Sequence, residues 1–345
     1  MQKKLIALAI ASLAAPAFAQ SNVSIYGSLD ATFATMTNDG VGVGQNDVTH
    51  KTSRLGFKGS EDLGNGYKAF FQLEERFMLD TSTADGSLRF KDKAWVGLEG
   101  GFGKVSFGRI PTALDIIYGG SKAGNDDTIA DWNGRKAKAI TRFDNGISYT
   151  SPKLGGMVTM HAATTAGDQA KERGTGTDGD RFRPYDIATN VSFGKAFVEA
   201  GYQYGGSQNF YKSIIVNGGY NFGFMNLYAA FVQSKSFEKE GLGTDGIKYT
   251  QYEIGADVKA GANGKVYVTL GQSKGKNSAG DIKPNNGGVS AEKYTKLGVA
   301  YVHSLSKRTQ LLAATSYAKQ NDGFTGGGEA EDNQIGLQVG LRHAF

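Results

Sequence analysis

The 345-residue chain has no cysteine, only five prolines, and no apolar run beyond residue 19 that approaches the length of a transmembrane helix. Without cysteine there is no disulfide framework, and a spanning helix needs ~20 consecutive apolar residues. Fifty glycines with so few prolines disfavour both long helices and a proline-rich disordered chain. Hydrophobic residues make up 39% of the chain, which is low for a large buried core. If this protein lies in a membrane, a closed β-barrel is the architecture that remains.

Signatures of catalysis and metal binding are also scarce. No histidine has a cysteine or a second histidine at metal spacing, and no serine lies in a GxSxG turn. Gly174, Gly176 and Gly179 match GxGxxG, but they lie in a polar stretch without the strand and helix that a dinucleotide site requires. The sequence therefore predicts a protein that is not an enzyme, with no cofactor, no metal site and no nucleic-acid partner.

What the sequence does contain is alternation with a period of two residues. Val23, Ile25 and Phe33 fall on one face of an extended segment, whereas Ser24 and Asp30 fall on the other. Similar segments of ten to fourteen residues recur along the chain, separated alternately by short glycine-rich turns and mostly longer polar loops. Seven turns and eight loops give sixteen strands. This pattern is typical of a single all-β domain, a transmembrane antiparallel β-barrel, whereas strands of a soluble sandwich are usually ~5–6 residues long.

The two ends of the chain carry further information. Residues 1–19 combine Lys3 and Lys4, a short apolar stretch and an Ala17-Phe18-Ala19 site, which predicts a cleaved signal peptide and a barrel over residues 20–345. The chain ends on the alternating stretch 333–345 with a terminal Phe345. In a closed barrel the last strand pairs with the first, so we expect residues 333–345 to pair with residues 22–34. Phe345 is then expected at the membrane boundary.

Positive charge is concentrated on the polar faces of the second to sixth expected strands. The basic residues there are Arg54, Lys58, Lys68, Arg76, Arg89, Lys91, Lys93, Lys104 and Arg142, whereas the acids are Glu74 and Asp144. At ~3.3 Å per residue and ~45° of tilt, Arg54 lies about 16 Å above its turn, near mid-barrel. We expect Arg54, Arg89, Lys91, Lys93 and Arg142 to form the basic wall of a pore constriction. Like charges at one level of the barrel repel each other, which costs free energy unless opposite charges compensate them.

The longest connection, residues 110–139, has a composition that could balance this positive charge. It is apolar at Ile116, Ile117, Tyr118 and Trp132, which favours packing inside the barrel over extension into solvent. Its acids are Asp115, Asp126, Asp127 and Asp131. Folded inward as the third external loop, it would narrow the pore and set these carboxylates opposite the basic wall. Such a transverse field across a narrow aqueous gap is a selectivity device, and basic rings favour anions.

Several stretches together resemble a known family. VSIYGSLDATF, SRLGFKGSEDLGNGYKAFFQLE, WVGLEGGFGKVSFGR, RFDNGISYTSPKLGG, HSLSKRTQL and the closing GLQVGLRHAF are similar to the trimeric general-diffusion porins of Gram-negative outer membranes, of the β-proteobacterial type. The resemblance covers nearly the whole chain after residue 19. It implies a homotrimer in the outer membrane, a third loop folded into each pore, and a terminal Phe345 read by the outer-membrane assembly machinery. The third loop departs from the commoner family pattern, because it has no PEFG-like stretch.

The function predicted is a passive channel for small hydrophilic solutes and ions, biased toward anions. One alternative is a porin selective for one solute class, such as organic anions or sugars. Inward aromatic residues are scattered, which favours the general channel. Another alternative is an enzyme or adhesin on a barrel scaffold, for which the sequence shows neither a converging catalytic group nor an added domain.

Overall fold

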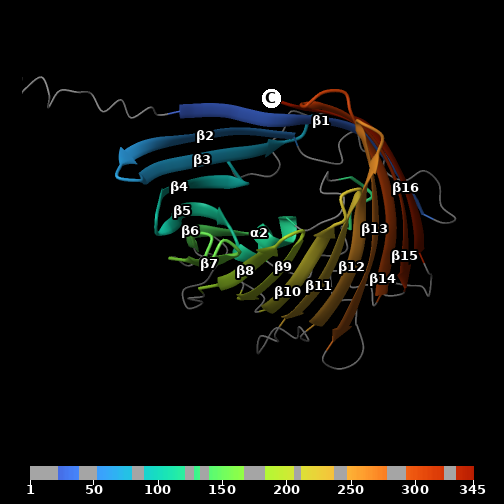
Figure 1. Ribbon diagram of the computed structural model, residues 1–345. Helices are drawn as coiled ribbons and strands as arrows, with labels where there is room; N and C mark the ends of the chain where they lie inside the picture. Colours follow the sequence, from blue (N-terminus) through green and yellow to red (C-terminus); the bar gives the residue numbers. More distant parts are fainter. Residues whose placement is uncertain are drawn as a thin grey trace, which may run out of the picture.

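The chain forms one closed barrel of sixteen antiparallel strands in a computed structural model, in which each strand pairs with its neighbours in sequence and β16 pairs with β1 (Figure 1). The structure describes residues 22–38, 53–79, 89–120, 128–132, 140–166, 183–205, 211–236, 247–277, 293–321 and 332–345. The predicted signal peptide and the acids Asp126 and Asp127 lie outside these residues. No helix within the described ranges is long and apolar enough to cross a membrane.

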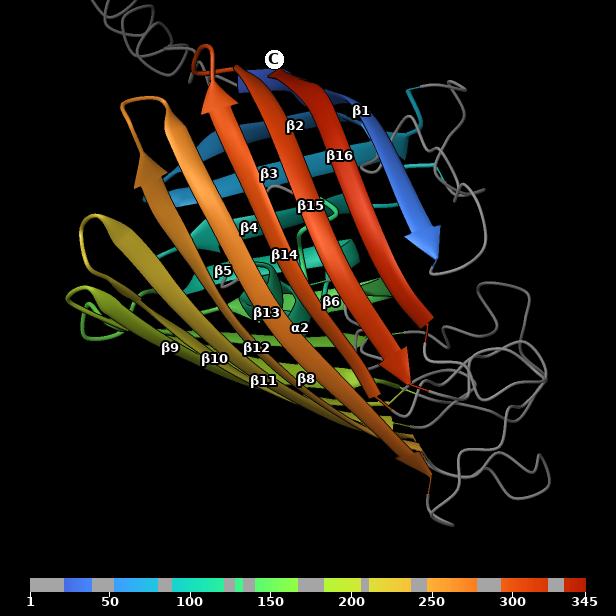
Figure 2. The same cartoon turned by 90° about the vertical axis from the view of Figure 1, so that its right-hand side faces the viewer.

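The strand bounds follow the alternating segments of the sequence. They are β1 (Asn22–Asn38), β2 (Ser53–Gly64), β3 (Tyr67–Phe77), β4 (Lys93–Gly100), β5 (Gly103–Pro111), β6 (Arg142–Thr150), β7 (Val158–Thr165), β8 (Tyr185–Phe193), β9 (Ala196–Tyr204), β10 (Tyr211–Asn221), β11 (Met225–Ser236), β12 (Ile247–Ala260), β13 (Gly264–Asn277), β14 (Lys293–Ser304), β15 (Thr309–Asn321) and β16 (Asp332–Ala344). One helix, α2 (Ala113–Gly120), follows β5. The short turns gather at one end of the barrel (Figure 2).

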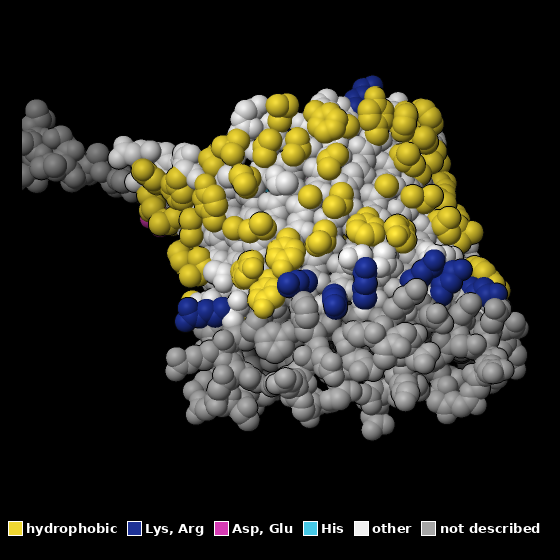
Figure 3. Space-filling model, turned by 90° about the horizontal axis from the view of Figure 1, so that it is seen from below, with side chains coloured by type: hydrophobic (Ala, Val, Ile, Leu, Met, Phe, Trp, Pro, Cys, Tyr) yellow, Lys and Arg dark blue, Asp and Glu magenta, His cyan; other side chains and the backbone are white. Residues whose placement is uncertain are grey.

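The two faces of the barrel wall have opposite character. In β1, Phe33 on the outward face is 66% exposed, whereas Asp30 and Thr32 on the inward face are buried. The same inversion continues around the wall, and a band of hydrophobic side chains covers the face that Figure 3 shows. A protein that exposes its apolar residues and covers its polar ones is adapted to a lipid solvent.

Closure between β1 and β16 is shifted along the strands relative to the sequence prediction. The register runs from Ser28 opposite Ala344 to Asn38 opposite Gln334, whereas Asn22 to Ser28 pair with β2. The predicted partner, residues 22–34, is therefore corrected to residues 28–38. The physical reason is that closing a tilted sheet staggers the strands, so the ends of the first and last strands do not coincide.

Phe345 lies where this closure ends. Its N–H donates to the carbonyl of Gly27 at 3.1 Å and its carbonyl accepts from the N–H of Gly27 at 3.2 Å. The phenyl ring covers Gly27, where a Cβ would overlap it, and the residue is 40% exposed. The aromatic side chain therefore lies at the short-turn end of the outward face.

The segment between β5 and β6 contacts the inward face of the wall along two adjoining arcs. Helix α2 packs against β7 to β10, with Leu114 and Ile117 over Gly201, and it also contacts β11 and β12 through Val232 and Gln251. Residues 128–132 pack against β13 to β16, where Trp132 covers Gly271 and Ala130 covers Gly298. A Cβ at any of these three glycines would overlap the segment. The absence of a side chain at these positions therefore leaves the space in which the segment packs.

Candidate constriction site

Helix α2 is positioned by the way β5 ends. A bulge between Gly108 and Ile110 breaks the regular pairing of β5 with β6, and Gly108 has a φ of 125° there. Beyond the bulge, Ile110 and Phe143 are fully buried in a small apolar cluster. Thr112 then caps the helix, because its hydroxyl accepts from the N–H of Asp115 at 3.2 Å. The N–H of Thr112 donates to the carbonyl of Thr141 at 3.0 Å, which ties the helix start to β6.

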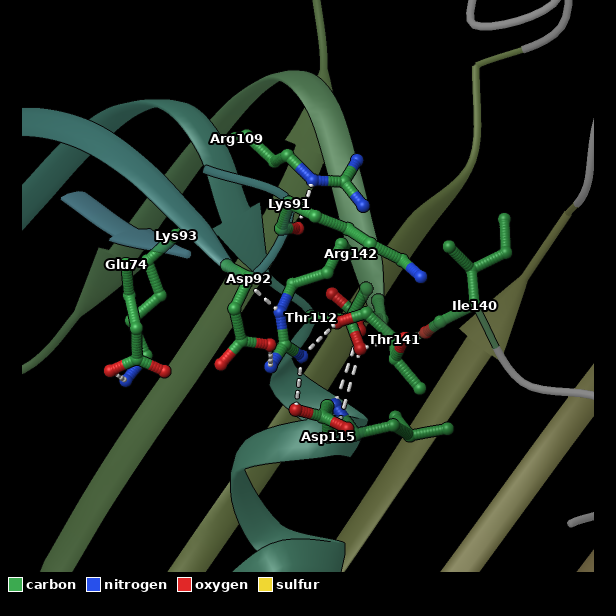
Figure 4. A network of polar contacts seen from close by, with 12 residues as sticks. Glu74, Lys91, Asp92, Lys93, Arg109, Thr112, Asp115, Ile140, Thr141 and Arg142 are labelled. Carbon is green, nitrogen blue, oxygen red and sulfur yellow. Dashed lines mark hydrogen bonds and ion pairs between the residues drawn. The ribbon is translucent and has the colours of Figure 1, made fainter. Parts of the chain in front are cut away.

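Arg142, the first residue of β6, joins this helix to the strand wall (Figure 4). Its guanidinium donates to the carboxylate of Asp115 in the first turn of α2. It also donates to the carboxylate and to the backbone carbonyl of Asp92, each at 2.8 Å. Asp92 accepts in addition from Arg76 at 2.7 Å. Two carboxylates and two guanidiniums thus form one connected network of charge-assisted hydrogen bonds.

Glu74 is the second centre of the same network. It accepts from Lys93 at 3.1 Å and from the hydroxyl of Tyr26 at 2.8 Å, and it lies 3.6 Å from a guanidinium nitrogen of Arg54. The N–H of Asp92 donates to its backbone carbonyl at 3.2 Å. The residues belong to β1, β2, β3 and β4, which are neighbours in the barrel. The network therefore covers a continuous patch of the inward wall.

Exposure divides the network by sign of charge around Glu74 and Asp92, but not at Asp115, which is 25% exposed beside an Arg142 side chain that is 12% exposed. The side chains of Arg54 and Arg76 are each 30% exposed and that of Lys93 is 24% exposed, whereas those of Glu74 and Asp92 are 2% and 6% exposed. The carboxylates of Glu74 and Asp92 thus lie beneath Arg54, Arg76 and Lys93. A solute in the lumen meets ammonium and guanidinium groups first, which gives this patch a positive surface although its charges are paired.

The ionisation of Asp92 is stabilised within this network. Burial acts to raise its pKa, but the hydrogen bond with Glu74 and the charges of Arg142, Arg76 and Arg54 outweigh burial and leave the pKa below its ordinary value. Asp92 precedes β4, in the connection from β3. It therefore remains ionised throughout the neutral range and keeps both guanidiniums in place.

Of the five predicted basic residues, the network includes three, one lines an adjoining cleft and one lies apart. Arg54, Lys93 and Arg142 belong to it, together with the predicted acid Asp115. Lys91 precedes β4 and lines a cleft of about 170 Å³ with Arg76, Asp92, Arg109, Asp115, Thr141 and Arg142. Arg89 lies apart, 82% exposed and 3.3 Å from Glu75. Glu75 alternates with Glu74 and Arg76, so it is on the opposite face of β3.

Asp131 is placed at a different part of the wall. It is buried, and its carboxylate is 3.5 Å from the hydroxyl of Thr128. Its backbone carbonyl accepts from Lys296 of β14 at 2.8 Å. It thus helps to anchor residues 128–132 on β14.

Sequence reasoning missed several members of the site. Asp92 is central, yet it was overlooked because it stands between two lysines in the stretch KDK and outside any strand. Arg109 donates to the carbonyl of Lys91 at 2.5 Å and pairs with Asp144. The capping role of Thr112 could have been found, because a threonine three residues before an aspartate is a helix-start signal. Among the described residues, no group of three or more potential ligands is arranged to hold a metal ion.

A closed barrel with an apolar outside, a polar inside and charged groups on its inner wall defines a class, the channels of Gram-negative outer membranes. The comparisons with known proteins identify the family. A sequence profile of the Gram-negative porin family matches residues 5–323, so the chain belongs to that family.

Individual relatives agree with this assignment. The chain is 32% identical to outer membrane porin protein 32 of Delftia acidovorans and 27% identical to an outer membrane porin protein of Bordetella pertussis, in each case over the full length of both chains. Among solved structures, an anion-selective porin from Comamonas acidovorans superposes with a TM-score of 0.76 at 28% identity, covering 94% of this chain and 100% of the other. The protein is therefore an outer-membrane channel for passive diffusion, as the sequence predicted.

Proposed function

We propose that the channel is biased toward anions by the wall patch of Arg54, Arg76, Lys93 and Arg142. The observation that carries this proposal is the division of exposure, in which Arg54, Arg76 and Lys93 are partly exposed and the carboxylates of Glu74 and Asp92 lie beneath them. An anion that passes gains favourable interactions with partly exposed donors, whereas a cation meets repulsion at the same level. The anion selectivity stated for the Comamonas acidovorans porin supports the same direction.

The remaining predicted constriction residues enter the proposal in different ways. Asp115 fixes Arg142 against α2, and Lys91 contributes positive charge to the adjoining cleft. Arg89 is not assigned to this wall, because it pairs with Glu75 on the other face of β3. We assign Asp131 an anchoring role rather than a place opposite the arginines, since its carbonyl binds Lys296.

The test is the reversal potential of single channels in a KCl gradient. A triple variant, Arg54→Gln with Arg76→Gln and Lys93→Gln, should shift the reversal potential toward cations while the channel still conducts. Lys265→Gln is the matched control, because Lys265 lies at the short-turn end of β13, away from the patch. If the triple variant conducts and its reversal potential is unchanged, the wall patch is not the source of the ion selectivity.

We further infer that the channel works as a homotrimer after removal of residues 1–19, and that the outer-membrane assembly machinery recognises the terminal Phe345. The resemblance to trimeric porins supports these inferences, and the channel relatives support a protein that is not an enzyme. Chemical cross-linking in membranes tests the trimer, and the mass of the exported chain tests a start at Gln20. Assembly of a Phe345→Ala variant at the wild-type rate would contradict the proposal that the assembly machinery recognises Phe345.

A further inference from the structure

A cavity of about 290 Å³ lies on the inward wall of β1 to β5, between the wall patch and the short turns. Its lining includes Ser24, Lys58, Phe70, Gln72, Trp95 and Lys104. The register sets Lys58 opposite Ser24 on one side and Gln72 on the other. Trp95 follows opposite Gln72, so one row of side chains crosses β1 to β4. Lys58 is four residues beyond Arg54 on β2, which is about 13 Å at ~3.3 Å per residue, so the cavity is separate from that arginine.

Two aromatic rings at this part of the wall each carry a lysine. The rings of Tyr26 and Phe70 each cover a glycine of a neighbouring strand, where a Cβ would overlap the ring. The ammonium nitrogen of Lys58 is 5.2 Å from the ring centre of Tyr26, and that of Lys104 is 4.1 Å from the ring centre of Phe70. A cation over a ring face is held by a weak electrostatic attraction and keeps its charge. Both lysines are therefore positioned by the wall without being neutralised by it.

Trp95 is the third aromatic residue of this region. It packs against the buried cluster that contains Ile110 and Phe143, which holds the indole in place. The inward aromatic residues are scattered in the sequence, but strand pairing brings Tyr26, Trp95 and Phe70 to three successive rows of the wall. Aromatic faces next to each other are suited to packing against a planar ring.

The charge of the cavity indicates the sign of its ligand. The charged residues of the lining are Lys58, Lys104 and Glu99, so two cations and one anion leave a formal net charge of +1. Glu99 is exposed and lies opposite Lys104 in the register. Within the described part of the chain, neither Lys58 nor Lys104 makes a salt bridge with a carboxylate. A small monoanion would balance the remaining positive charge.

We propose that this cavity binds small monocarboxylates that carry a planar ring, of the size of benzoate. The carboxylate would be attracted by the ammonium groups of Lys58 and Lys104, and the ring would pack against Phe70 and Trp95. The site goes beyond the anion bias of the wall patch, because it lies on other residues and selects by shape as well as by charge. It also gives a solute that has passed the constriction a place to bind before the short-turn end.

The experiment measures binding of benzoate to the refolded full chain in neutral detergent micelles, by titration calorimetry. Lys58→Gln and Lys104→Gln should each weaken binding by about five- to tenfold, the loss expected for one partly exposed charged contact. Glu99→Gln should bind benzoate more tightly, because it removes the negative charge at the edge of the cavity. Lys265→Gln is the matched control, since Lys265 is an exposed lysine on the inward face of β13 and should not affect binding.

Other ligands and one aromatic variant test the role of the ring. Wild type should bind benzoate more tightly than cyclohexanecarboxylate, and Phe70→Leu, which keeps the cavity apolar, should reduce that preference. Equal affinity for benzoate and acetate would show a site for any small anion, and equal affinity for benzoate and benzamide would show a site for any ring. Either result would overturn the proposal. Absence of saturable benzoate binding by wild type, or wild-type affinity in both lysine variants, would also overturn it.

A variant of the wall patch separates this site from the proposed source of the anion bias. Arg54→Gln with Arg76→Gln should shift the reversal potential in KCl toward cations and should still bind benzoate. Loss of benzoate binding in this variant, with normal binding in both lysine variants, would place the ligand at the constriction and overturn the inference while the anion bias stands. An unchanged reversal potential with intact benzoate binding would contradict only the proposed function.

Discussion

Replacing Gly298 by alanine should release residues 128–132 from the barrel wall and widen the pore. A Cβ at Gly298 would overlap the backbone carbonyl of Ala130. An ordinary contact between carbon and oxygen is ~3.3–3.6 Å, so this carbonyl must retreat by more than about 1 Å. The obstructing group is backbone, which cannot rotate away as a side chain can. The segment must therefore move as a unit.

The hydrogen bonds that hold the segment set the magnitude of the effect. Thr269 donates to the carbonyl of Ala130 at 2.5 Å, Lys296 donates to that of Asp131 at 2.8 Å, and the N–H of Ile129 donates to Gln338 at 2.9 Å. Neutral bonds contribute ≈0.5–1.5 kcal/mol each and a charged one ≈1.5–3 kcal/mol, so two neutral bonds and one charged bond sum to roughly 2.5–6 kcal/mol. Losing about 3 kcal/mol lowers the docked population by about 100-fold relative to the undocked one.

Single-channel recording is the assay, combined with thermal unfolding of the refolded barrel. The Gly298→Ala channel should show higher conductance and more current noise, whereas the barrel stays folded because its strand pairing is untouched. Gly101→Ala is the control, since a Cβ there meets nothing within 4 Å. Thr269→Val, which removes one hydrogen bond without adding bulk, should have a smaller effect. Wild-type conductance and noise in a folded Gly298→Ala barrel would refute the docking argument.

Two predictions concern the charged network. Glu74→Gln removes the carboxylate between Arg54 and Lys93, so the anion preference read from reversal potentials should increase; a shift toward cations would contradict the proposed wall. Asp92→Asn should lower the free energy of unfolding in detergent by about 1.5–3 kcal/mol, because it removes the charged partner of Arg76 and one of the two charged partners of Arg142. Folding lowers the pKa of Asp92. The stabilisation that the Asp92 carboxylate gives the folded state is therefore complete above the pKa of the unfolded chain, about 4, and is lost as the pH falls through the lower pKa of the folded state. The stability difference between wild type and Asp92→Asn should therefore be constant from about pH 8 to pH 5 and should shrink only in stronger acid; a difference that shrinks already between pH 7 and pH 5 would count against this account.

The sequence was sufficient for those features that depend on local periodicity. The count of turns and loops predicted the number of strands, and alternation along each segment predicted which side chains face outward, because a side chain's face depends only on its position along the strand. The positions of the turns followed from short glycine-rich stretches. Arg54, Lys93 and Arg142 were found in the same way, as basic residues on polar faces.

Features that depend on relations between distant strands were not predictable from one sequence. The stagger of β1 against β16 arises from closure of the whole barrel, which no single segment encodes. The docking of residues 128–132 depends on Gly271 and Gly298, more than a hundred positions away. Arg89 was expected on the polar face of a strand, but β4 begins at Lys93, so the alternation rule does not apply to Arg89.

The two attachments of the segment between β5 and β6 have a mechanical consequence. A tube with a wall one sheet thick flattens easily, because a small change of angle between neighbouring strands is spread around the ring. This segment is fastened to β7–β12 through α2 and to β13–β16 through residues 128–132. It acts as an internal brace of fixed span. The shape of the opening is thus governed by the length of one connection, and insertions or deletions there would change the bore of the tube without altering a single strand.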